Sequence, residues 1–143
     1  MKNTLKNNKK IITFILTTLV FLFIFSGCDQ AKDNKENTYM QITAKEAKAL
    51  MDKETEYVIL DVRTEEEFSE AHIDGAILIP DYEIRAKAES ILTDKEQLIL
   101  VYCRSGRRSK LAANELVTLG YTNVKEFGGI IDWPYEVVNK IQK

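Results

Sequence analysis

The stretch Leu98–Ser109, which reads LILVYCRSGRRS, decides the fold. It begins with the unbroken apolar run LILVY, which is typical of a strand buried on both faces of a sheet. From Ser109 to Leu119 the apolar residues recur at a spacing near 3.6, which predicts an amphipathic helix, and Gly120 is placed to end it. A buried strand joined by a short loop to a helix is the repeating unit of a parallel α/β sheet.

Strands and helices are expected to alternate along the rest of the chain. Tyr57–Val62 is a second apolar run rich in β-branched residues, so it predicts another strand buried on both faces. Capping boxes, in which a threonine is followed three residues later by a glutamate, predict helix starts at Thr43 and Thr64. The alternation predicts a three-layer α/β domain with a small, mostly parallel sheet flanked by helices on both faces. The other expected strands are Tyr39–Ile42, Ala76–Ile79 and Val124–Phe127, and the expected helices run from Thr43 to about Asp52, for a short distance from Thr64, over Tyr82–Leu92, and over Ile130–Ile141 with Pro134 near its first turn.

The first 27 residues have the layout of a secretory signal. Four lysines and no acidic residue precede the apolar run Ile11–Phe25, and Ser26 and Gly27 then lead to Cys28. The run is 15 residues long, whereas a membrane-spanning helix needs about 20. A cleaved signal therefore fits better than an uncleaved anchor helix. The sequence Ser26-Gly27-Cys28 resembles the lipobox of bacterial lipoproteins, in which a diacylglyceryl group is attached to the cysteine.

The lipobox resemblance implies three regions. They are a lipoprotein signal peptide at 1–27, lipidated Cys28 with a polar, flexible tether to residue 38, and one folded domain at 39–143. The protein is then expected at a cell membrane, held by its lipid and facing the extracytoplasmic side. The alternative is a secreted protein in which Cys28 lies near the cleavage site by chance.

Charge and cysteine content exclude several functions. Cleavage before Cys28 removes four of the 20 basic residues and none of the 22 acidic ones, which leaves a net charge of −6. That charge argues against nucleic-acid binding and leaves membrane attachment to the lipid alone. The chain has two cysteines, Cys28 and Cys103, and one histidine, His72, which are too few ligands for a zinc site. If Cys28 carries lipid, Cys103 has no partner within the chain, which indicates either a reactive thiol or intermolecular pairing. We expect no metal, no cofactor and a monomer.

Three arginines accompany Cys103 in the loop after the LILVY strand: Arg104, Arg107 and Arg108. The loop leads into a helix N-terminus, where free backbone N–H groups bind anions, and Gly106 permits the backbone geometry that gathers such groups. A thiol in this setting has a depressed pKa, and the same groups stabilise negative charge on a leaving group. The alternative is that Cys103 is a small core residue and the arginines are solvated.

Three motifs, in order along the chain, resemble those of the single-domain rhodaneses. Residues 103–109, CRSGRRS, resemble the active-site loop C-R-x-G-x-R-S of that family. Segments 61–80 and 128–133 resemble its motifs D-V-R-x-x-x-E-[YF]-x-x-G-H-I-x-G-A-x-x-I-P and G-G-x-x-x-W. The resemblance extends from about Gln41 to Lys140, and the departures at Ala71 and Leu78 lie outside the cysteine loop. It implies a rhodanese-like fold and a sulfurtransferase.

The resemblance also implies that Cys103 is the catalytic nucleophile. Its thiolate would take the outer sulfur of a small anionic donor such as thiosulfate, and a thiol or cyanide acceptor would remove that sulfur from the persulfide. No general base is needed if the thiolate is preformed. Asp61 and Arg63 are expected to support the neighbouring loop through hydrogen bonds and an ion pair. The expected donor-binding residues are Arg104, Ser105, Gly106, Arg107, Arg108 and Ser109.

Two other functions remain open. Phosphatases and arsenate reductases share this fold, but their loop, Cys-x5-Arg, places an arginine six residues after the cysteine, where this chain has Ser109. Rhodanese-like domains also act as sulfur carriers or binding modules with weak turnover, and an intact cysteine loop does not separate a carrier from an enzyme. His72 is expected to serve packing rather than catalysis.

Overall fold

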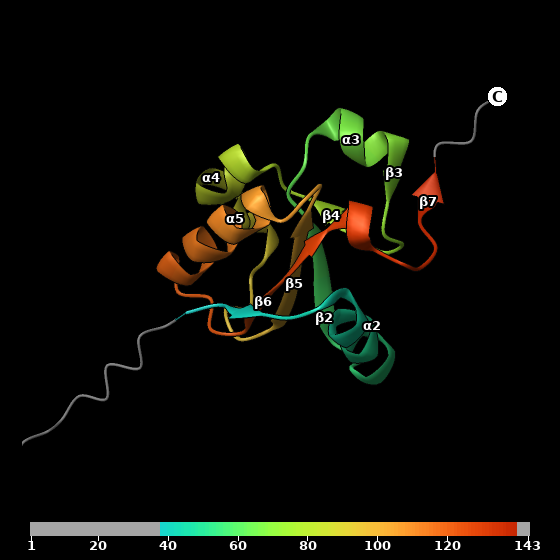
Figure 1. Cartoon of the computed structure of the whole chain (residues 1–143). Coiled ribbons are helices and arrows are strands. Elements are labelled where there is room, and N and C mark those ends of the chain that lie inside the picture. The colour runs from blue at the N-terminus through green and yellow to red at the C-terminus, as the bar shows by residue number, and fades with distance from the viewer. Residues whose placement is uncertain (1–37, 140–143) are drawn as a thin grey trace, which may run out of the picture. The chain divides into compact units, whose positions relative to one another are not determined.

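Strand β5 (Leu98–Cys103) lies in the middle of a five-stranded sheet, as its apolar run predicts. The computed structural model describes residues 38–139 (Figure 1). The predicted signal peptide, the predicted lipidation site Cys28 and the predicted tether up to residue 37 lie outside the described residues. No helix within residues 38–139 combines the length and the apolar character needed to cross a membrane.

All neighbouring strands of this sheet run parallel, in the order β1-β6-β5-β2-β4. The other strands are β1 (Met40–Gln41), β2 (Tyr57–Asp61), β4 (Ile77–Leu78) and β6 (Val124–Gly129). Because parallel strands end at the same edge, Asp61, Cys103 and Gly129 all lie at the carboxyl edge of the sheet. Ligands of open α/β sheets bind at this edge.

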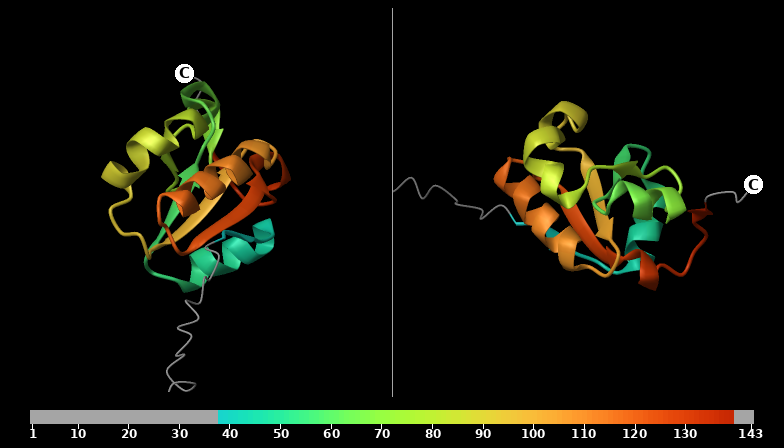
Figure 2. Two further views of the ribbon diagram at one scale, coloured as in Figure 1. Left: turned by 90° about the vertical axis from the view of Figure 1, so that its left-hand side faces the viewer. Right: turned by 90° about the horizontal axis from the view of Figure 1, so that it is seen from above.

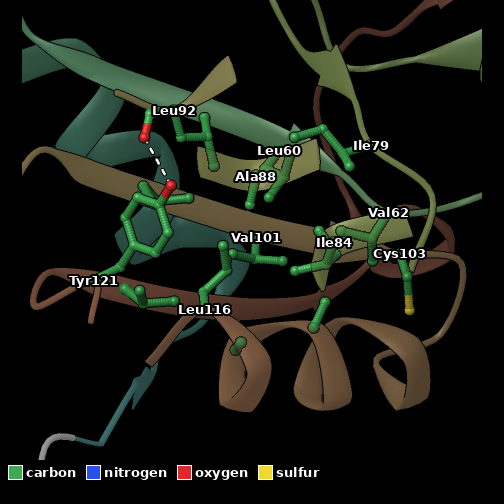
Figure 3. Close-up of a cluster of buried hydrophobic side chains, with 14 residues drawn as sticks. Leu60, Val62, Ile79, Ile84, Ala88, Leu92, Val101, Cys103, Leu116 and Tyr121 are labelled. Carbon is green, nitrogen blue, oxygen red and sulfur yellow. Dashed lines mark hydrogen bonds between the residues drawn. The ribbon is translucent and has the colours of Figure 1, made fainter. Parts of the chain in front are cut away.

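Helices cover both faces of the sheet, which confirms the predicted three-layer α/β fold (Figure 2). The helices are α2 (Ala44–Lys53), α3 (Glu65–Glu70), α4 (Ile84–Ile91) and α5 (Arg107–Thr118). Helices α4 and α5 pack on the face that carries Ile99, Val101 and Cys103 of β5 (Figure 3). Helix α2 packs on the opposite face, with Leu98 and Leu100. The residues of β5 divide between the two faces because successive side chains of a strand point to opposite faces of the sheet.

The predicted helix caps are present. Thr43 and Thr64 each accept a hydrogen bond from the backbone N–H of the glutamate three residues on, and each glutamate carboxylate accepts one from the threonine N–H. Helix α5 ends in a Schellman motif, in which Gly120 adopts φ 93° and the N–H groups of Gly120 and Tyr121 donate to carbonyls of the last turn.

Two helices begin at residues other than those predicted. Helix α5 begins at Arg107 rather than Ser109, so its first turn carries two of the loop arginines. A 3₁₀ turn, η1 (Asp81–Glu83), occupies the start of the predicted helix Tyr82–Leu92, and α4 follows from Ile84.

The predicted helix Ile130–Ile141 is wrong over its described part. The chain forms only a 3₁₀ turn, η2 (Ile130–Asp132), and then runs without a helix to strand β7 (Val138–Asn139). A residue before proline is disfavoured in the helical conformation, and Trp133, before Pro134, is extended at φ −80° and ψ 111°. Strand β7 pairs antiparallel with β3 (Ala71–His72), and neither strand was predicted.

Candidate active site

Cys103 is the last residue of β5, and its side chain is 1% exposed. Figure 3 shows its sulfur beside the N-terminal end of α5. The backbone N–H of Gly106 donates to the Cys103 Sγ at 3.1 Å. Gly106 has φ 92°, a left-handed conformation that glycine adopts without strain. The turn made by Gly106 therefore brings a backbone donor to the sulfur.

The surroundings of Cys103 lower the pKa of its thiol below the ordinary value. Burial acts in the opposite direction and raises the pKa, because a buried thiolate loses hydration. The opposing effect, which lowers the pKa, comes from hydrogen-bonding groups near the sulfur: the Ser109 hydroxyl and the backbone N–H groups of Ser109, Ser105 and Gly106. Of these donors, the Gly106 N–H makes a direct hydrogen bond to the Sγ. Since the thiolate is the nucleophilic form of cysteine, the site favours attack by sulfur.

The three loop arginines have different surroundings. The Arg108 guanidinium forms a bidentate ion pair with the Glu67 carboxylate of α3, with Nη1–Oε2 and Nη2–Oε1 distances of 2.7 and 2.8 Å. Arg104 and Arg107 are exposed, and neither forms an ion pair among residues 38–139. Two unpaired cations thus stand at the loop, whereas Arg108 joins the start of α5 to α3. A role for Arg108 in donor binding stays a prediction.

Glu67 is expected to make folding stability depend on acidity. The hydrogen-bonded Arg108 guanidinium lowers the pKa of Glu67 from 4.5 to about 2, against the opposing effect of partial burial. A carboxylate with a depressed pKa stabilises the fold above its unfolded-state pKa and loses that contribution as the pH falls towards its folded-state pKa. With Glu67 partly exposed, we expect a loss of about 1 to 2 kcal/mol in the free energy of unfolding between about pH 5 and pH 2. Urea unfolding across this range should show the loss in the native chain and a smaller one in Glu67→Gln, and equal losses would contradict the prediction.

Asp61 and Arg63 form a buried ion pair beside the cysteine loop. The Arg63 Nη2 lies 2.6 Å from Asp61 Oδ2, the Arg63 Nε donates to both carboxylate oxygens at 3.0 Å, and the Arg63 backbone N–H donates to Oδ1 at 2.9 Å. The same Nη2 donates to the Ala71 carbonyl at 2.6 Å. Arg63 is 5% exposed and Asp61 is fully buried. The pair therefore joins the end of β2 to the start of β3, and its predicted role in supporting the neighbouring loop stays a prediction.

Gly129 brings the cysteine loop into direct backbone contact with β6. A Cβ atom at Gly129 would lie 2.2 Å from the Arg104 carbonyl oxygen and 2.6 Å from the Ser105 Cα. The backbone N–H of Ile131 also donates to the Arg104 carbonyl at 3.3 Å. Only glycine allows this approach, because any side chain at the position overlaps the loop backbone.

Gly129→Ala is expected to displace the loop and to lower the free energy of unfolding by about 1 to 3 kcal/mol. The cost arises from overlap with the backbone of Arg104 and Ser105 and not from the backbone angles of Gly129, whose φ of −125° suits any residue. Thermal unfolding measures the loss of stability, and the pH dependence of Cys103 alkylation measures the displacement. An unchanged unfolding midpoint would mean that the loop moves aside at no cost.

Glu126 is a buried residue of the site that sequence reasoning missed. It is 2% exposed and lies on β6, where it accepts a hydrogen bond from the Ser109 hydroxyl at 2.6 Å. Ser109, one of the predicted donor-binding residues, is itself fully buried. A signal was present in the sequence: Glu126 follows Val124 by two positions, so both side chains occupy the same face of a strand.

The arrangement suits a reaction between a small anion and a buried cysteine whose thiol pKa is lowered. Backbone N–H groups and exposed arginines attract negative charge, and the thiolate attacks a soft electrophile such as sulfur. Within residues 38–139, no group of three or more potential metal ligands is gathered.

Residues 43–134 match the Rhodanese family, described as the rhodanese-like domain, and this match covers more than half of the chain. The protein therefore belongs to the rhodanese-like family. It is similar to the thiosulfate sulfurtransferase PspE of Escherichia coli, with 38% identity over 73 residues that cover 51% of this chain and 70% of the relative. It is also similar to the putative sulfur carrier protein YrkF of Bacillus subtilis, with 32% identity over 112 residues, or 78% of this chain and 59% of that protein.

A solved structure titled a rhodanese with anions, from E. coli, superposes on this chain with a TM-score of 0.55 and 35% identity. The superposition covers 58% of this chain and 98% of that structure. Membership of the family makes this chain a rhodanese-like sulfurtransferase or sulfur carrier, with a sulfur donor and a sulfur acceptor as its substrates.

Proposed function

We propose that this protein transfers sulfane sulfur from thiosulfate or a similar anionic donor to a thiophilic acceptor through a persulfide on Cys103. The observation that carries the proposal is the hydrogen-bonded Cys103 sulfur, whose pKa is lowered at the end of a helix-capping loop. The likeness to a thiosulfate sulfurtransferase supports the choice of donor.

The reaction takes place in two displacements at sulfur. The Cys103 thiolate attacks the outer sulfur of thiosulfate, a new S–S bond forms, the old one breaks, and sulfite leaves with the electron pair. The acceptor, cyanide or a thiolate, then attacks the terminal sulfur, and Cys103 leaves as a thiolate. Backbone donors such as the Gly106 N–H stabilise the sulfur anion in both steps. Arg104 and Arg107 attract the donor from solvent.

The surroundings of Ser109 support sulfur rather than phosphorus chemistry. In a Cys-x5-Arg loop this position would carry the arginine that binds phosphate, but here it carries a fully buried serine. Arg108, one position earlier, is paired with Glu67. The described site therefore offers no arginine where a phosphatase needs one.

Mass spectrometry of the full-length chain after thiosulfate treatment tests the proposal. We expect a gain of one sulfur atom, located on Cys103 by peptide mapping and removed by cyanide with release of thiocyanate. Cys103→Ser is the matched control and should gain nothing. Hydrolysis of p-nitrophenyl phosphate without any gain of sulfur would instead assign the chain to the phosphatases.

Sulfur delivery to another protein is the second candidate function. The exposed Arg104 and Arg107 beside the loop and the likeness to a putative sulfur carrier favour it. A carrier should form the Cys103 persulfide readily, yet turn over slowly with cyanide and quickly with a protein thiol. Rates with the two acceptors therefore separate a carrier from an enzyme.

We also propose that Cys28 is lipidated and holds the protein at a membrane, on the extracytoplasmic side. The support is the sequence pattern alone: a basic start, the apolar run Ile11–Phe25 and the small residues before Cys28. Metabolic labelling with a fatty acid should label the native chain and not Cys28→Ser. Equal labelling of both would reject the lipid site.

A further inference from the structure

Glu126 is a buried carboxylate that no cation of the described residues balances. Its side chain is 2% exposed, and within residues 38–139 no ion pair involves it. All of its side-chain hydrogen-bond donors are neutral: the Ser109 hydroxyl at 2.6 Å, the Gly128 N–H at 2.8 Å and the Gln41 Nε2 at 3.3 Å. Because a buried carboxylate needs strong donors when no cation is present, Ser109 is the main partner of Glu126.

Ser109 lies between this carboxylate and the reactive sulfur. Its hydroxyl and its backbone N–H are both among the groups near the sulfur that can lower the pKa of the Cys103 thiol. A hydroxyl has a single proton, however, and can donate it to one acceptor at a time. The Ser109 hydroxyl lies 2.6 Å from the Glu126 Oε1 and 3.4 Å from the Gly128 carbonyl oxygen, so the carboxylate is the closer acceptor of this proton. Glu126 and Cys103 therefore compete for the same donor.

Glu126 also lies directly behind the turn that holds the sulfur. A Cβ atom on Gly106 would lie 3.9 Å from the Glu126 Oε1, and the N–H of Gly106 donates to the Cys103 Sγ. The charged group facing the sulfur from α5 is Arg108, whose guanidinium is paired with Glu67. The carboxylate that competes for Ser109 is thus close to the sulfur and is not neutralised by the nearby arginine.

We propose that Glu126 is a positioning residue that draws the Ser109 hydroxyl proton away from Cys103 and leaves the sulfur with backbone donors alone. A thiolate with fewer donors is more basic, and a more basic thiolate is the stronger nucleophile. In the sulfur-transfer reaction, on which this consequence rests, the Cys103 thiolate is then a stronger nucleophile towards the donor sulfur than it would be with the Ser109 hydroxyl as a further donor.

Alkylation of Cys103 by iodoacetamide, followed against pH, tests the proposal without any sulfur donor. The full-length chain carries Cys28→Ser so that Cys103 is its sole thiol. Glu126→Gln keeps the shape of the side chain but replaces the carboxylate with a weaker, neutral acceptor, so Ser109 can donate to the sulfur. We expect the apparent pKa of the Cys103 thiol to fall by about one unit.

Ser109→Ala and the double variant show whether the effect passes through Ser109. Ser109→Ala alone should change the thiol pKa by only about a few tenths of a unit, because the native hydroxyl proton is held by Glu126. In the Ser109→Ala background, Glu126→Gln should lose most of its effect. Glu136→Gln, which removes an exposed carboxylate, is the control and should leave the thiol pKa unchanged.

Three results would overturn the proposal. They are an unchanged or raised thiol pKa in Glu126→Gln, an undiminished fall in the Ser109→Ala background, and a rise of about one unit in Ser109→Ala alone. The pKa measured in Ser109→Ala alone tests the proposal even if Glu126→Gln fails to fold. The alkylation titration needs no turnover. If the variants show the expected thiol pKa values but the native protein forms no persulfide, the sulfur-transfer function is refuted and the proposed role of Glu126 stands.

Discussion

Replacing Cys103 with serine is expected to reduce thiosulfate:cyanide sulfur transfer by about a thousandfold or more. The serine hydroxyl stays protonated at neutral pH, so it is a poor nucleophile without an adjacent base, and it provides no sulfur to carry the persulfide. Initial rates of thiocyanate formation measure the effect. The full-length Cys28→Ser variant is the control and should keep the native rate, because the proposed mechanism uses no thiol other than that of Cys103. Activity retained in Cys103→Ser would reject the persulfide mechanism.

Arg63→Met is expected to lower the free energy of unfolding by about 3 to 5 kcal/mol. The substitution removes a guanidinium that makes three hydrogen bonds to the Asp61 side chain, and it leaves a fully buried carboxylate without its cation. Urea unfolding monitored by circular dichroism measures the loss. Adding Asp61→Asn should recover part of the stability, because the unpaired charge is then removed as well.

Arg85→Met is the matched control for the buried pair. Arg85 also pairs with a carboxylate, that of Glu115, but its side chain is 74% exposed. Exposed ion pairs contribute at most about 1 kcal/mol, so this substitution should have little effect. An equal loss in the two variants would show that removal of an arginine, and not the burial of the pair, causes the destabilisation.

The sequence predicts the sheet and most helices because their signals are local. The apolar run of β5 and the capping boxes at Thr43 and Thr64 each lie within a few residues, and the structure confirms them. Strands β3 and β7 have two residues each and pair across a separation of more than 60 residues. Such short strands carry no periodic pattern. The predicted helix Ile130–Ile141 does not form over its described part because Trp133, the residue before Pro134, adopts an extended conformation.

For the candidate site, too, the local features are predictable from the sequence and the long-range contacts are not. A thiol between a buried strand and a helix start, followed by Gly106, indicates a nest of backbone donors, and the structure shows such a donor on the sulfur. The partners of the loop are not predictable in this way. Glu67 is 41 residues before Arg108, and Glu126 is 17 residues after Ser109. Only the packing of α3 and β6 against the start of α5 determines which charged groups meet there.

The Arg104–Ser105 backbone rests directly on Gly129 of the sheet, with no side chain between them. Under the proposed function, an anionic donor would meet a loop that is already ordered, and its binding would cost little conformational entropy in the protein. The rate of donor binding would then depend mainly on long-range attraction by Arg104 and Arg107, which salt screens beyond about 8 Å at physiological ionic strength. The reaction with the donor should therefore be fast at low ionic strength and slow at high ionic strength, with no change in the structure of the loop.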